Sequence, residues 1–193
     1  VDFTVETYGS HLSVWRQTHK EKLISFIKNR IIFELQLKAG TKEFDLLQGI
    51  FAAGFDDIAN VYQKFEQLSK EINNPSFIRA CKVAERTGNI LKGVKDDVKE
   101  IKPELFSETL EKDLFRMIEE QESAIWNLVT QGNYGASAKA FGEQFYEPVH
   151  KFFDQIMVNV PDEKVRMNRQ ALVKRINRIL SDQVADLSQI KAS

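Results

Sequence analysis

Apolar residues recur every three or four positions along most of this chain, and alternation of apolar and polar residues with a period of two is rare. A period near 3.6 residues is typical of amphipathic helices, whereas a period of two would indicate strands. Leu, Ile, Lys, Glu and Gln, which favour helices, fill the stretches between the four prolines. The pattern therefore predicts an all-α protein.

Glycine, proline and capping residues divide this pattern into segments. Gly40, Gly54 and Gly93 each follow a periodic stretch, where glycine suits the left-handed residue that ends a helix. Pro148 fits the first turn of a helix, and Asp162 is a good N-cap. The helices expected from these signals cover residues 14–38, 45–53, 56–72, 76–91, 107–130, 133–145, 148–158 and 162–187.

Helices of this length joined by short turns pack as a multi-helix bundle, and the 14 phenylalanines would supply much of its core. We expect a single domain over residues 1–193. Within it, residues 1–13 are expected to be a linker or the tail of a preceding domain, and residues 94–104 an internal connector. Because residue 1 is valine rather than methionine, we expect the chain to be a fragment of a longer protein.

Composition is ordinary for a soluble globular protein, with 42% hydrophobic and 28% charged residues. No apolar run approaches the roughly 20 residues that span a bilayer, so no membrane partner is expected. Cys81 is the single cysteine, which excludes an intramolecular disulfide and is consistent with a reducing compartment. These features favour a cytoplasmic location.

The net charge is −1, but the charges are segregated. Residues 16–42 contain seven Lys or Arg against two acids, and residues 162–178 contain six against two. Residues 95–122 contain ten acids against five basic residues. A neutral total made of such blocks can still present a positive face to a polyanion. The plainer alternative is that these are solvated helix faces.

The sequence gives no support for a catalytic role. His11, His19 and His150 are far apart and lack carboxylates at ligand-like spacing, so each is expected at the surface and no metal site is expected. Phosphate-binding glycine loops and a nucleophile elbow are also missing. We therefore expect no catalytic residue and no cofactor in this chain.

The predicted helix over residues 76–91 has one polar, cationic face. At 100° per residue, Lys82, Arg86 and Asn89 lie within about 60° of one another, and Arg79 lies beside them. RNA recognition uses cations for phosphates and amide or guanidinium groups for base edges. These four residues are therefore candidate RNA contacts, with an ordinary solvated face as the alternative.

Helical periodicity alone does not explain several short motifs in the second half of the chain. Residues 152–154 read Phe-Phe-Asp, residues 166–172 read Arg-Met-Asn-Arg-Gln-Ala-Leu, and residues 132–134 read Gly-Asn-Tyr. Two weaker motifs precede them, Phe26 with Arg30, and the run Glu85-Arg86-Thr87-Gly88-Asn89-Ile90. In this order and spacing, residues 20–190 resemble the C-terminal, DALR-like anticodon-binding domain of the β subunit of bacterial-type glycyl-tRNA synthetases. Glu85 departs from the resemblance, because the family usually has lysine there.

The resemblance implies a DALR-like all-α fold and recognition of the anticodon loop of glycine tRNA, with cytosine at the second and third anticodon positions. It implies that ATP-dependent attachment of glycine occurs on a separate catalytic α subunit, which would be a partner of this chain. DNA is not expected to be a partner. The resemblance also favours Arg86 and Asn89 as RNA contacts, because both match the family. Two alternatives remain open: an arginyl-type anticodon-binding domain, and a helical protein-interaction module without RNA binding.

Residues of the last predicted helix allow two roles. Arg169 projects into the apolar stripe, while Arg166 and Asn168 lie at its edges and are further candidate RNA contacts. A buried guanidinium must be paired, so we predict a structural ion pair between Arg169 and Asp154. Arg30 is expected to pair with Glu34 one turn later.

Aromatic side chains could also stack on bases. The candidates are Phe33, Tyr62 and Tyr134, but a core position is the simpler expectation for each. Trp15 and Trp126 are expected to be core or interface anchors.

Overall fold

The computed structural model describes residues 17–55, 57–94 and 100–190, and within these ranges it contains helices and no strands. The all-α prediction is confirmed. The chain divides into two compact units, Val1–Phe44 and Asp45–Ser193. Their boundary falls inside the helix Lys42–Ala53, so no break in the helical pattern marks it, and the sequence predicted one domain.

The first unit contains helix α2, Gln17–Glu34, which is shorter at its C-terminal end than predicted. Gln36 and Gly40 follow it with positive φ angles of 53° and 85°, which end the helical path. The expected pair is confirmed, since Arg30 Nε donates to Glu34 Oε1 at 2.9 Å. Residues 14–16 of the predicted helix lie outside the described residues.

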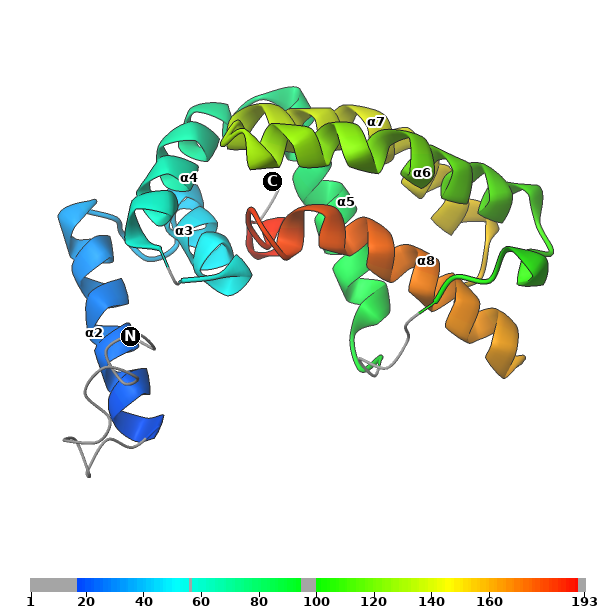
Figure 1. The fold of residues 1–193 in the computed structure, drawn as a ribbon, viewed down its shortest axis with the longest axis horizontal. Helices are drawn as coiled ribbons and strands as arrows, with labels where there is room; N and C mark the ends of the chain where they lie inside the picture. The colour runs from blue at the N-terminus through cyan, green and yellow to red at the C-terminus, as the bar shows by residue number, and fades with distance from the viewer. Residues whose placement is uncertain (1–16, 56, 95–99, 191–193) are drawn as a thin grey trace. The chain divides into compact units, whose positions relative to one another are not determined.

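The second unit holds the remaining elements (Figure 1). They are α3 (Lys42–Ala53, from Asp45 onward), α4 (Ile58–Glu71), α5 (Pro75–Leu91), η1 (Pro103–Leu105), α6 (Thr109–Thr130), α7 (Tyr134–Gln155), α8 (Glu163–Ser181) and η2 (Leu187–Gln189). Side-chain caps fix several starts: Asp57, Asn74 and Asp162 each accept a hydrogen bond from a backbone N–H in the first turn. The N-cap role predicted for Asp162 is confirmed.

Helix α7 differs from the prediction, because it is one continuous helix with Pro148 inside it rather than two helices that meet there. Proline removes a backbone donor and usually ends or bends a helix. Here Phe141, Phe145, Val149 and Phe152 form one buried stripe on both sides of Pro148. Burial of this stripe holds the helix together across the proline.

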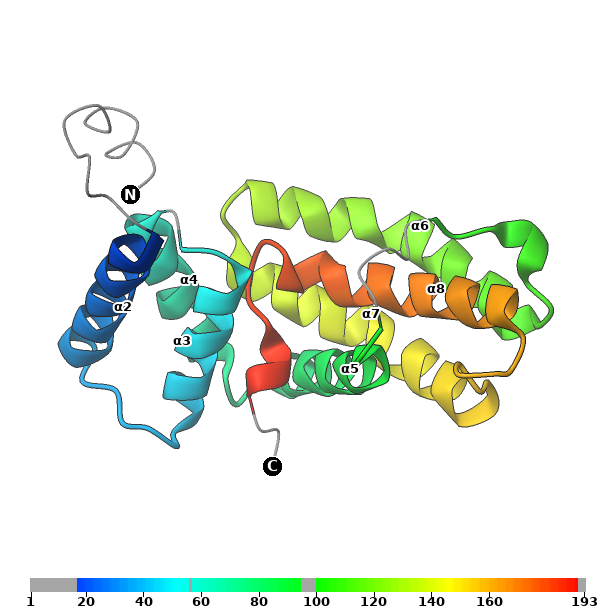
Figure 2. The same ribbon diagram turned by 90° about the horizontal axis from the view of Figure 1, so that it is seen from below.

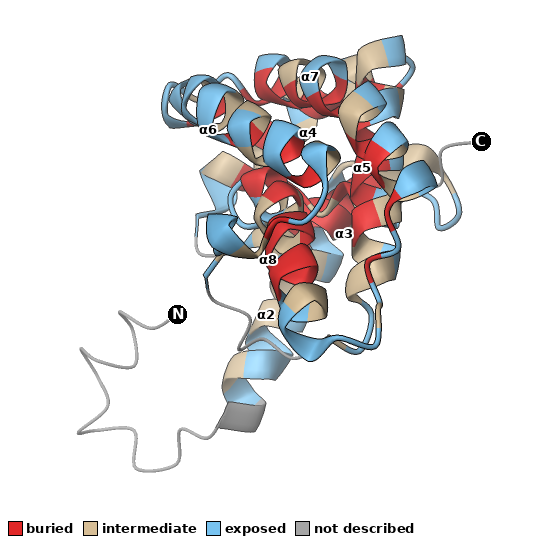
Figure 3. Cartoon of the chain, turned by 90° about the vertical axis from the view of Figure 1, so that its right-hand side faces the viewer, coloured by how far each residue is buried: buried red, intermediate tan, exposed pale blue. Residues whose placement is uncertain are grey.

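Helices α7 and α8 each pack against both α5 and α6. Figure 2 shows α8 between α6 and α5. The core lies where these four helices meet, and the buried residues follow the facing sides of α5, α7 and α8 (Figure 3). Phe77, Phe141, Phe145 and Phe152 are among its largest fully buried side chains, and isoleucine, leucine and valine fill most of the rest.

Helices α5 and α7 run in the same direction along their contact. Successive contacts join Ser76 to Glu143, Arg79 to Tyr146, and Arg86 to Asp154. Gly142 permits this close approach, because a Cβ atom there would overlap the carbonyl oxygen of Ser76. In this parallel arrangement, each residue of α5 lies beside the residue of α7 that is 67 or 68 positions later in the sequence.

The C-terminal segment also departs from the prediction. Helix α8 ends at Ser181 instead of continuing to residue 187. The chain then turns, and the N–H of Asp186 donates to the carbonyl of Gly49 in α3 at 2.9 Å. A Cβ atom at Gly49 would overlap the Asp186 carbonyl oxygen, so the close approach requires glycine. Contact with α3 therefore ends the helical path early.

The three stacking candidates differ in burial. Tyr134 is buried, as expected, and its hydroxyl accepts a hydrogen bond from Asn60 Nδ2 at 2.5 Å. Tyr62 is half-buried. Phe33 is 73% exposed, so the core position predicted for it is wrong. No helix in the described ranges is both long and apolar enough to cross a membrane.

Candidate nucleic-acid interface

Helix α5 presents the two faces that the sequence predicted. Arg79, Lys82 and Asn89 are exposed, and Arg86 is half-buried. The residues on the other side are buried against the core: Phe77, Ala80, Val83, Ala84 and Thr87. The structure therefore brings four of the six candidate RNA contacts onto one surface.

Aromatic rings of α7 lie beside this face. Tyr146, His150 and Phe153 follow one side of α7 at spacings of four and three residues, and each is half-buried. Arg79 lies over the Tyr146 ring at 5.5 Å, and Arg86 lies over the Phe153 ring at 5.2 Å. We call Arg79, Lys82, Arg86, Tyr146, His150 and Phe153 the α5–α7 seam. It combines cations with planar groups, which are the two elements that bind single-stranded RNA.

Arg86 is the most constrained cation of the seam. Its Nη2 donates to Asp154 Oδ1 at 2.5 Å while its guanidinium covers Phe153. The side chain of Asp154 is 63% exposed, so the pair lies at the surface. Such a pair orients Arg86 but contributes little to stability. Lys82, one turn earlier, is exposed and has no ion-pair partner among the described residues.

The C-terminal end of α5 borders a cavity of about 740 Å³. Asn89 lines it, and Lys92 Nζ donates to Asn89 Oδ1 at 2.7 Å. Glu85, where the resembling family has lysine, is exposed and lines the same cavity. A carboxylate there lowers the positive potential at this end of α5.

Arg169 is buried and paired, but the predicted partner is wrong. Its Nε donates to Glu111 Oε1 at 2.8 Å, and its two terminal nitrogens donate to the Met157 carbonyl and to Ser107 Oγ. Asp154 pairs with Arg86 instead. The prediction assumed that an acid of the preceding helix would face α8, whereas Asp154 points toward α5 and a carboxylate at the start of α6 reaches the core.

Glu111 joins this buried pair to the first turn of α6. Its Oε2 accepts hydrogen bonds from the backbone N–H groups of Ser107 and Glu108 at 2.9 and 2.8 Å. Burial raises the pKa of Glu111, but the hydrogen bond from Arg169 and those from the backbone outweigh it, so the pKa lies below its ordinary value. The carboxylate is therefore held in its charged form.

Arg166 and Asn168 serve the fold in this structure. Arg166 Nη1 donates to the Val160 carbonyl at 3.0 Å in the loop before α8. Asn168 is 3% exposed, and its amide both accepts from the Lys102 N–H and donates to the Lys102 carbonyl. A buried amide with both groups bonded cannot reach a base, so the RNA contact predicted for Asn168 does not fit the structure. Neither residue belongs to the α5–α7 seam.

The described ranges contain no arrangement of side chains typical of a metal site. No group of three or more His, Cys, Asp or Glu residues is arranged to hold a metal ion there. His19 is exposed, and His150 is half-buried with its ring 4.1 Å from the Tyr146 ring. His11 lies outside the described residues.

Sequence analysis missed the aromatic half of the seam and the role of Glu111. Tyr146, His150 and Phe153 have the three- and four-residue spacing of one helix face, as do Arg79, Lys82 and Arg86, but this spacing does not reveal that the two faces pack together. At the start of α6, Glu111 accepts a hydrogen bond from the Glu108 N–H, but glutamate is not a preferred N-cap residue, so the sequence gives only a weak signal there. Only the three-dimensional contacts show that Glu111 also reaches Arg169.

Comparison with known families matches residues 76–188, more than half of the chain, to the family described as "DALR anticodon binding domain". The matched range begins in α5 and ends in η2, so it includes the α5–α7 seam and the buried Arg169–Glu111 pair.

Similar curated proteins are beta subunits of glycine–tRNA ligase. That of Moorella thermoacetica is 29% identical over 171 residues, which are 89% of this chain and 24% of the relative. That of Trichlorobacter lovleyi is 27% identical over 191 residues, which are 98% of this chain and 27% of the relative. The chain thus spans about a quarter of the length of these relatives.

Proposed function

Because the chain belongs to the DALR anticodon binding domain family, we propose that it binds the anticodon loop of a tRNA through the α5–α7 seam. The observation that carries this proposal is the placement of Arg79 and Arg86 over the half-buried rings of Tyr146 and Phe153. Guanidinium groups contact phosphates, and rings at the same surface stack on unpaired bases.

The relatives point to glycine tRNA as the ligand, because they are beta subunits of glycine–tRNA ligase. On this proposal, the chain recognises cytosine at the second and third anticodon positions, and glycine is attached to the tRNA on a separate α subunit. The chain contributes binding and orientation, and phosphate contacts position the loop while polar side chains read the bases.

A filter-binding titration with glycine tRNA and with an anticodon-swapped control tests the proposal. We expect tighter binding to the glycine tRNA. The logarithm of affinity should fall with the logarithm of salt concentration by roughly 0.7 per neutralised phosphate. Equal binding of both tRNAs, or none, would contradict anticodon recognition and favour a protein-interaction module.

Lys82→Glu locates the surface. It reverses an exposed charge that has no ion-pair partner among the described residues, so the fold should be unaffected. We expect weaker tRNA binding and a salt slope smaller by roughly 0.7. Lys112→Glu is the matched control, because Lys112 is an exposed helical lysine on α6, outside the seam. If both variants bind alike, the seam is not the interface.

A further inference from the structure

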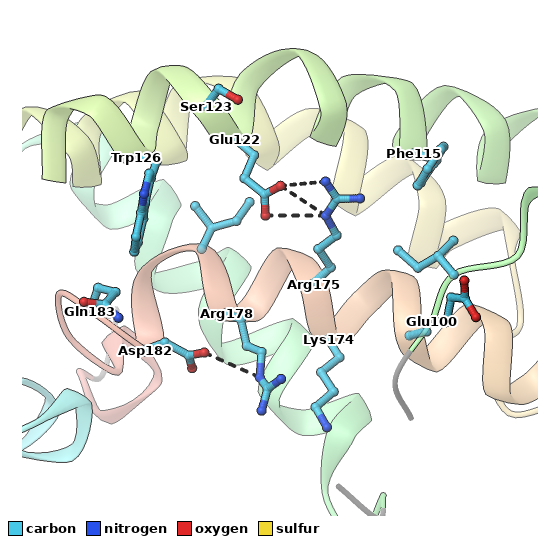
Figure 4. A pocket seen from close by; sticks show the side chains of 13 residues that line it. Glu100, Phe115, Glu122, Ser123, Trp126, Lys174, Arg175, Arg178, Asp182 and Gln183 are labelled. Carbon is cyan, nitrogen blue, oxygen red and sulfur yellow. Dashed lines mark hydrogen bonds and ion pairs between the residues drawn. The ribbon is translucent and has the colours of Figure 1, made fainter. Parts of the chain in front are cut away.

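A cavity of about 710 Å³ opens between α6 and α8, apart from the α5–α7 seam (Figure 4). Its volume lies in the range that holds small organic ligands. Side chains of α6 form one wall and those of α8 the other, with the buried Ala171 and Ile179 among the lining. The cavity combines an apolar lining with charged groups at its edge.

Trp126 is the unusual residue of this cavity. It is 44% exposed, although its neighbour Ile125 is buried in the core. In Figure 4 its indole projects from α6 across the opening toward Gln183. No ring or cation of the described residues stacks on it. A large aromatic face left in water beside a cavity is suited to a planar ligand.

Arg175 joins the two helices that line the opening. Its guanidinium bridges from α8 to Glu122 of α6 at 2.6 Å, also pairs with Glu119, and lies 5.8 Å from the Phe115 ring. The hydrogen bond that Arg175 donates to the Glu122 carboxylate is the main reason that the pKa of Arg175 is raised. Because its guanidinium is already paired with two carboxylates, Arg175 links α6 and α8 beside Trp126.

Polar groups for a base edge lie opposite the indole. The Gln183 side chain is exposed and makes no hydrogen bond with the described residues, so its amide can both donate and accept. Lys174 and Arg178 line the edge of the cavity, where a phosphate would lie, and Arg178 also pairs with Asp182 at 3.6 Å. Stacking surface, amide and cations together match a single unpaired nucleotide.

The cavity also connects toward α5. A second cavity of about 230 Å³ shares Lys174, Arg178 and Asp182 with it. The cavity of about 740 Å³ beside Asn89 shares Leu91 and Asn177 with the second. The three cavities are therefore neighbours along α8, between Trp126 and the C-terminal end of α5, and we call this row the furrow.

We propose that the α6–α8 cavity holds one splayed-out base of the bound tRNA, stacked on Trp126 and hydrogen-bonded by Gln183. This inference rests on the proposed function and adds a second contact to it. The furrow would carry the strand between this base and the α5–α7 seam.

Fluorescence tests the stacking directly. In a Trp15→Phe chain, Trp126 is the only tryptophan, and saturation with glycine tRNA is expected to quench its emission. In filter binding, Trp126→Ala should weaken affinity by roughly 5- to 150-fold, the range for loss of one stacked base. Trp126→Phe keeps an aromatic ring and should bind within about threefold of wild type.

The outcomes separate the two proposals. Full tRNA binding without quenching, or a folded Trp126→Ala chain that binds like wild type, would overturn the Trp126 site and leave the proposed function standing. If the wild-type chain binds no tRNA at all, both the proposed function and this inference are overturned. Circular dichroism verifies the fold of each variant, and the exposure of Trp126 makes a large loss of stability unexpected.

Discussion

Arg169 brings a charge into the core of the second unit, where Glu111, Ser107 and Met157 bind it. Replacing it with methionine keeps the volume but leaves the Glu111 carboxylate without its cation. We expect Arg169→Met to lower the free energy of unfolding by about 3–5 kcal/mol, as measured by urea denaturation. Arg116→Met on the exposed side of α6 should cost less than about 1 kcal/mol. Equal stability of the two variants would show that the buried pair is dispensable.

The same pair makes stability depend on pH. The pKa of Glu111 is lower in the folded chain than in the unfolded one, where it is about 4.3. Its stabilising contribution is therefore complete above that value and is lost as pH falls through the folded pKa. We expect the difference in unfolding free energy between wild type and Glu111→Gln to be constant above about pH 5 and to shrink at lower pH. A difference that stays constant down to pH 3 would contradict this.

At the scale of elements, the contact of α5 with α7 depends on Gly142. An alanine there would drive its Cβ into the Ser76 carbonyl, which α5 cannot avoid without shifting. We expect Gly142→Ala to destabilise the chain by about 1–3 kcal/mol in thermal unfolding.

Gly88→Ala is the matched control for this prediction. Gly88 also lies in a helix, but a Cβ there would meet only the Ser188 side chain at 3.7 Å. Alanine favours helix over glycine, so this variant should be as stable as wild type or more stable by up to about 1 kcal/mol. If both substitutions have the same effect, the close contact of α5 with α7 does not limit stability.

The sequence predicts a helix end correctly when a local capping residue sets it. It does not predict an end that is set by packing against another part of the chain. The caps at Asp162 and Gly93 follow from local chemistry, and both ends lie where the sequence placed them. The predictions at Pro148 and at the end of α8 were wrong because packing decides both: burial of one stripe of α7 carries that helix past Pro148, and contact with Gly49 accompanies the end of α8.

For the molecule as a whole, a basic residue in the sequence is not always a free cation in the structure. Arg86, Arg169, Arg175 and Arg178 each have a carboxylate partner. The polar face of α5 was predictable, because helical periodicity places its residues. The partners of Arg86, Arg169 and Arg175 were not, because they lie 68, 58 and 53 positions away in the sequence. A sequence therefore identifies candidate cations more readily than it identifies those that can meet a phosphate.

This pairing predicts that Asp154 weakens tRNA binding by competing with phosphate for Arg86. Asp154→Asn should raise affinity for glycine tRNA by up to about fivefold, which corresponds to removal of a repulsion of about 1 kcal/mol. Asp113→Asn is the control, because Asp113 likewise pairs with an arginine, Arg116 on α6. An unchanged or lower affinity of the Asp154 variant would argue against a phosphate near Arg86.

The parallel course of α5 and α7 has a consequence for how the chain acquires its structure. Their contact joins residues such as Ser76 and Glu143, which are 67 positions apart, and all of α6 must be made in between. Contacts of such long range slow folding. During synthesis, the apolar side of α5 must therefore wait for α7 to emerge, which makes the interval between them the period of greatest exposure to aggregation.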